Sequence, residues 1–232
     1  MRALNHADPL AGLVSPSLLG SSGVVPLSIV SVIPDIMRHY AELIVQAEAE
    51  IILATNYWEK SASSSVLADA LRDLSKRVEA RNGAKVVMKL MYDRGNLRQV
   101  VNNRIIVKPV YWSRIGLPTE DEIPGVALEI INYHRPLLGT FHAKYLIVDR
   151  RVACLNSNNV QDRSNVEMMV QLEGPVVDSI YDMALISWSD AMNPPLPLLS
   201  KVPTYPVVYK FQHDNEDLRC VPLASELQTL VF

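Results

Sequence analysis

The spacing of apolar residues along this chain predicts three amphipathic helices and a series of short strands. Helical spacing runs through 34–50, through 61–82 after a run of serines, and through 175–188, where Pro175 fits a first helical turn. Asn82-Gly83 supplies a left-handed stop for the second helix. Short apolar runs predict strands at 50–57, 85–92, 104–107, 126–131, 145–148, 152–155, 166–172 and 205–211.

The order of these elements predicts an α/β fold. Strand, helix and strand over 50–92 form a βαβ unit, whose crossover makes the two strands parallel. The later runs are closely spaced, so we expect one large mixed sheet sandwiched by helices. We expect an irregular segment over 1–33, one domain over 34–192, and a proline-rich linker and tail over 193–232, starting at Asn193-Pro-Pro-Leu-Pro.

The first 33 residues contain a fairly apolar stretch, but they lack the pattern of a membrane-spanning or targeting segment. Pro16, Gly20 and Pro26 interrupt it, so no run approaches the roughly 18 residues that cross a bilayer. A signal peptide or mitochondrial presequence needs a basic start, and Arg2 is the only arginine before Arg38. We therefore expect an intracellular protein, either cytoplasmic or peripheral on a membrane.

Composition narrows the classes of partner. The chain has 232 residues, 49% of them hydrophobic, which is enough for a full core. Its 22 lysines and arginines against 25 acidic residues give a formal charge of −3, so any phosphate site must be local, and nucleic acid is the less expected partner. Cys154 and Cys220 form neither a disulfide framework nor a metal-ligand cluster.

Polar residues between positions 142 and 167 carry the candidate chemistry. His142 and Lys144 are two apart on one predicted strand, so an imidazole and an ammonium face the same side, a pairing that suits a phosphate. Ser157 and Asn159 follow the next strand, again two apart, and offer donors to non-bridging oxygens. Glu167 begins another strand, and its carboxylate can set the tautomer of His142 by binding one ring nitrogen.

The spacing of these residues resembles a known motif. His142-x-Lys144, then four residues and Asp149, then six residues and Asn-Ser-Asn-Asn at 156–159, is similar to the HKD motif of the phospholipase D superfamily. The segment 163–167, Arg-Ser-Asn-x-Glu, resembles the continuation of that motif. The resemblance implies a phospholipase D-like half over residues 34–192.

The resemblance also implies roles. His142 would attack phosphorus to give a phosphohistidine, with no metal and no cofactor, and Glu167 would orient that ring. Asp149 would be structural and hold the loop around the site. The side chains implied to bind the phosphate oxygens are Lys144, Ser157 and Asn159.

Two features depart from the superfamily pattern. Asn156 stands where a glycine normally precedes the serine; asparagine tolerates left-handed backbone angles, but its side chain can crowd the phosphate. The site also needs two HKD motifs, and this chain has one, since His134-Arg-Pro lacks the lysine. A second motif would come from a homodimer partner or from a second half of a longer protein.

Three functions follow from these observations. The first is a phosphodiesterase or phosphatidyltransferase that acts on a phospholipid, with water or an alcohol as acceptor. The second is a nuclease with the same chemistry, which the acidic balance of the chain disfavours. The third is an inactive half that binds a phosphate headgroup or a partner, for which Asn156 and the single motif are the evidence.

Overall fold

The fold is built on one mixed sheet, as the sequence predicted. The computed structural model describes residues 21–95, 99, 102–135, 140–188, 191–199 and 228–231. The sheet order is β4-β5-β3-β2-β6-β7-β8-β1-β9. Its strands are β1 (Ser22–Val32), β2 (Glu50–Thr55), β3 (Val86–Tyr92), β4 (Arg104–Ile106), β5 (Val126–Tyr133), β6 (Tyr145–Val148), β7 (Val152–Asn156), β8 (Val166–Glu173) and β9 (Gln228–Val231).

The centre of the sheet combines parallel and antiparallel pairs. β3 lies parallel to both β2 and β5, and α3 (Ala62–Ala80) forms the crossover from β2 to β3, so the predicted βαβ unit is confirmed. In the remainder of the sheet, from the β2–β6 pair through β7, β8 and β1 to β9, all neighbouring strands are antiparallel. β2 and β3 are buried throughout, which explains their continuous apolar runs.

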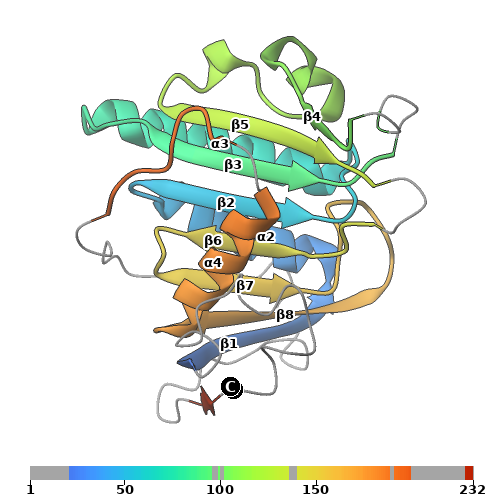
Figure 1. Cartoon of the computed structure of the whole chain (residues 1–232), viewed down its shortest axis with the longest axis vertical. Coiled ribbons are helices and arrows are strands. Elements are labelled where there is room, and N and C mark those ends of the chain that lie inside the picture. The colour runs from blue at the N-terminus through green and yellow to red at the C-terminus, as the bar shows by residue number, and fades with distance from the viewer. Residues whose placement is uncertain are drawn as a thin grey trace.

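Helices cover both faces of the sheet (Figure 1). α2 (Ile33–Gln46) packs with α3 on one face, where their apolar stripes form the larger core with alternate side chains of the strands. α4 (Val176–Trp188) covers the other face and forms the second core with the remaining strand residues. All three predicted helices are thus present, with α2 ending four residues before the predicted limit.

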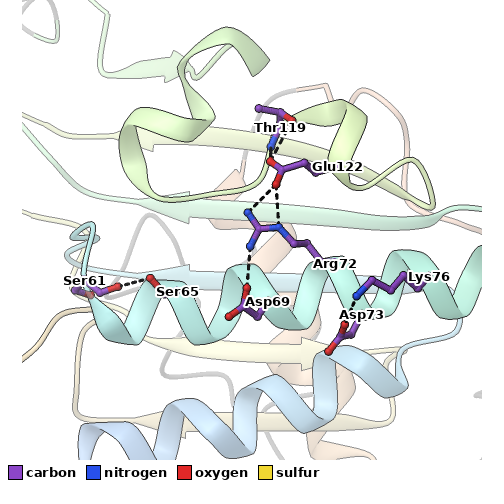
Figure 2. A network of polar contacts seen from close by, with 8 residues as sticks. All are labelled: Ser61, Ser65, Asp69, Arg72, Asp73, Lys76, Thr119 and Glu122. Atoms are coloured by element: carbon purple, nitrogen blue, oxygen red, sulfur yellow. Dashed lines mark hydrogen bonds and ion pairs between the residues drawn. The ribbon is translucent and has the colours of Figure 1, made fainter.

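Local signals set the ends of α3 and its attachment. Ser61 is the N-cap and shares a capping box with Ser64, and Asn82 takes a left-handed φ of 50° after the last turn. Figure 2 shows how Arg72 on α3 pairs with Asp69 and with Glu122 of a short 3-10 turn, at 2.8 and 2.9 Å. The Arg72–Glu122 pair joins the 3-10 turn to the helix.

The predicted irregular segment over 1–33 is wrong for residues 22–32. They form β1, which pairs with β8 and β9. Leu27 and Ile29 alternate with more exposed neighbours, a strand period that the proline and glycine interruptions conceal. Pro26 lies where the register with β8 shifts between Val24 and Leu27, a position at which a strand tolerates proline.

Residues 191–199 pack onto the sheet, whereas the sequence predicted a linker from 193 onward. Lys89 is fully buried and donates to Glu129 at 2.6 Å and to the carbonyl of Pro194, while Asn193 N–H donates to Glu129. Arg150 donates to the carbonyl of Pro197 at 2.8 Å. The segment satisfies buried polar groups of the sheet, which holds it on the face that α4 also covers.

None of the helices in the described segments combines the length and the hydropathy that a bilayer crossing requires. The strand predicted over 205–211 lies outside the described residues.

Candidate phosphate site

The candidate residues gather at one edge of the sheet because several strand ends meet there. β2, β3 and β5 run parallel and end at this edge, on the right-hand side of Figure 1. β6 and β8 run the opposite way and begin at it, and β7 ends at it. Residues that follow β3 and β5 or precede β6 therefore come together although they lie far apart in the chain.

His142 and Lys144 contact each other just before β6. The Nζ atom of Lys144 lies 3.2 Å from Nε2 and 3.3 Å from Nδ1 of His142, and it donates to the His142 carbonyl at 2.9 Å. Lys144 is buried, whereas His142 is exposed. Burial lowers the pKa of Lys144, and the negative charge of Glu167 opposes that effect.

Glu167 lies within electrostatic reach of Lys144, but it contacts Ser157 rather than His142. One carboxylate oxygen accepts the Ser157 hydroxyl, and the other accepts the amide of Asn165. The hydroxyl oxygen of Ser157 also accepts the backbone N–H of Met168 at 2.9 Å. The structure therefore groups the predicted serine with the predicted glutamate, and it does not join that glutamate to the histidine ring among the described contacts.

Asn159 lies beside the residues that follow β2. Its Oδ1 accepts the backbone N–H of Tyr57 at 3.3 Å, while the side chain of Asn56 donates to the carbonyl of Phe141, next to His142. A polar pocket lies between these segments, lined by residues 56, 57 and 59 on one side and by 159 and 161–163 on the other. Residues 56 and 57 thus connect the two halves of the predicted motif.

Asp149 lies at the opposite edge of the sheet, where it holds residues 48–50 and not the loop around the site that the resemblance implied. It is fully buried and accepts the backbone N–H groups of Glu48, Ala49 and Glu50 at 2.8 to 2.9 Å. Burial raises its pKa, and these donors oppose the rise. Asp149 and Arg150 have φ values of 52° and 53°, as a tight hairpin turn between β6 and β7 requires.

Asn156 belongs to β7 and does not use a left-handed backbone. Its side chain accepts the hydroxyl of Tyr40 and donates to Asn158, so it is held between α2 and the following turn. Its backbone N–H donates to the carbonyl of Lys144 at 3.3 Å.

One group at this edge was not predicted. Asp93, which follows β3, is buried and lies 2.7 Å from Nδ1 of His134, which follows β5. Its other oxygen accepts the N–H of Phe141 at 2.8 Å. The sequence holds one indication of this pair: Asp93 and His134 each follow a predicted strand, and the carboxyl ends of parallel strands share one edge of a sheet. Within the described segments, no three histidine, cysteine or acidic side chains are grouped as a metal site.

Comparison with known proteins gives structural matches only. No family model and no curated protein matches the sequence. Nuc, a phospholipase D family member from Salmonella typhimurium, is similar over 66% of this chain and 85% of its own, with 19% identity and a TM-score of 0.42. NucT from Helicobacter pylori is similar over 69% and 91%, with 15% identity and a TM-score of 0.39. TrmBL2, an archaeal chromatin protein whose structure shows a mode of DNA binding, is similar over 77% and 56%, with 16% identity and a TM-score of 0.36.

Proposed function

We propose that this chain carries one half of a phospholipase D-type site and hydrolyses or transfers a phosphodiester through a phosphohistidine on His142. The observation that carries the proposal is the contact of Lys144 with the His142 ring at the edge where Ser157 and Glu167 also lie. An exposed imidazole beside a buried ammonium places a nucleophile next to a charge that attracts phosphate oxygens.

The reaction has two displacements. A ring nitrogen of His142 forms a bond to phosphorus, and the bond from phosphorus to the leaving alkoxide breaks, with a proton supplied by a second histidine. Water or an alcohol then attacks phosphorus, the phosphorus–nitrogen bond breaks, and the second histidine takes the proton of the attacking oxygen. Lys144, Ser157 and Asn159 bind the non-bridging oxygens in both steps.

The second histidine comes from another HKD motif, on a second copy of this chain or on a second half. A two-fold pairing would bring the His142 side chains together. We favour a phospholipid as the substrate because a chain with a charge of −3 gives no general attraction to a nucleic acid.

Acid-quench trapping tests the phosphohistidine. Wild type and His142→Asn are incubated with a phosphatidyl-labelled lipid in mixed micelles, and with a labelled single-stranded oligonucleotide. Protein-bound label from the lipid is expected in the wild type alone. Label retained by His142→Asn would reject the nucleophile, and label from the oligonucleotide alone would make the chain a nuclease. If neither substrate labels a chain that analytical ultracentrifugation shows to be dimeric, the chain is an inactive half that binds a phosphate headgroup or a partner.

A further inference from the structure

The side chain of Asn156 connects a helix to the turn that carries Ser157 and Asn159. Tyr40 is buried in α2 and donates its hydroxyl to Oδ1 of Asn156. Burial raises the pKa of Tyr40 well above its ordinary value, so the hydroxyl remains a neutral donor. The Asn156 amide is therefore oriented with its oxygen toward α2 and its nitrogen toward the turn.

The amide nitrogen continues the connection into the turn. Nδ2 of Asn156 donates to the backbone carbonyl and to the side-chain oxygen of Asn158, both at 2.8 Å. Asn158 is almost fully buried, and its own amide donates to the carbonyl of Asn159 at 3.1 Å. Side-chain hydrogen bonds thus lead from Tyr40 to a residue that the proposed function places on the phosphate.

We propose that Asn156 is a positioning residue, which together with Tyr40 holds the turn at 157–159 in the conformation that binds phosphate. The inference rests on the proposed function, because it assigns a role through Ser157 and Asn159. A glycine at 156, the residue of the superfamily pattern, removes the amide that Tyr40 orients. Substitution of Asn156 by glycine therefore weakens the phosphate site of this chain.

Binding of inorganic phosphate, followed by isothermal titration calorimetry, tests the inference without requiring turnover. Asn156→Gly and the isosteric Asn156→Asp should each weaken binding by roughly five- to tenfold, because each loses the hydrogen bonds to Asn158. Ser75→Ala is the matched control. Ser75 is buried beside the opposite edge of the sheet, where its hydroxyl donates to Glu79 and accepts the N–H of Gly125. Its loss should therefore lower stability and leave phosphate affinity unchanged.

A double-mutant cycle separates positioning from general stability. If Tyr40 acts through Asn156, Tyr40→Phe weakens phosphate binding in the wild type but has no further effect in Asn156→Gly. Additive losses, or wild-type affinity in folded Asn156→Asp, would overturn the inference. Tyr40→Phe and Asn156→Asp preserve side-chain volume, so they test whether Asn156 positions the turn even if the glycine variant does not fold.

Lys144→Ala distinguishes a failure of the inference about Asn156 from a failure of the proposed function. If this variant loses phosphate binding while the Asn156 variants keep it, the inference fails and the proposed function stands. If Lys144→Ala binds phosphate like the wild type, the proposed function itself fails, and the inference with it.

Discussion

Asp93 and His134 form a hydrogen-bonded pair, 2.7 Å apart, across the adjacent ends of β3 and β5. The same carboxylate accepts the N–H of Phe141, the residue before His142. Because Asp93 is buried and uses both oxygens, it connects two strand ends to the segment that carries the proposed nucleophile.

Replacing Asp93 should impair the site more than its loss of stability explains. Asp93→Ala leaves the Phe141 N–H without its acceptor, which we expect to cost about 1–3 kcal/mol of unfolding free energy. The segment at 141–142 then shifts, and we expect phosphate binding to weaken by about tenfold. Asp73→Ala, which removes an exposed carboxylate paired with Lys76 on α3, is the control for charge. Equal phosphate affinity in the two variants would contradict a role for Asp93.

Asp149 should contribute to stability and not to phosphate binding. In Asp149→Asn one of the three backbone donors at residues 48–50 faces an NH₂ group, so urea unfolding should show a loss of roughly 1.5–3 kcal/mol. Asparagine tolerates the positive φ of the turn, so the lost unfolding free energy reports the contribution of the carboxylate and not backbone strain. Asp149 lies about 16 Å from Lys144 along β6, by a rise of about 3.3 Å per residue, so folded protein should keep its phosphate affinity. A parallel loss of affinity would place Asp149 in the site.

Phosphate binding should weaken in the alkaline range as Lys144 loses its proton. Burial lowers the pKa of this amine below its ordinary 10.5, so the charge that holds phosphate is present at low pH and is lost as the pH rises through the lowered pKa. Glu167 opposes this lowering, so Glu167→Gln should move the loss of binding to lower pH. Titration calorimetry at a series of pH values measures both curves. A shift to higher pH in the variant would contradict the proposed coupling.

His39 should make the protein less stable in mild acid. Burial lowers the pKa of His39 from 6.5 to about 4. In the folded protein its Nε2 atom lies 2.9 Å from the side-chain oxygen of Gln171, within hydrogen-bonding distance. The unfolded chain therefore binds a proton below 6.5 that the folded chain binds only below about 4. Stability from this group is full above 6.5 and falls between the two values, by roughly 2 kcal/mol at about pH 5. Denaturant unfolding at neutral pH and at about pH 5 measures how much unfolding free energy is lost in acid. This loss should be smaller for His39→Gln than for the wild type, and an equal loss in both would show that His39 is not its source.

The sequence by itself determined the local elements and the class of fold. Helical and strand periods located α2, α3, α4 and the central strands, since burial of one helix face or of both strand faces imposes a pattern on neighbouring residues. The βαβ order also implied parallel strands. Spacing and the motif resemblance singled out His142, Lys144, Ser157 and Glu167 as candidates, although His142 and Lys144 lie just before β6 and not on the strand where they were predicted.

Only the tertiary structure decided which residues meet. Glu167 contacts Ser157 rather than His142, because the antiparallel pairing of β7 with β8 brings the residue after β7 beside the start of β8. Asp149 lies at the far edge because β6 separates it from Lys144. The contacts of Asp93 with His134 and of Tyr40 with Asn156 join residues 41 and 116 positions apart. No local pattern records such pairs, because their hydrogen bonds depend on strand order and helix packing, which the whole chain determines.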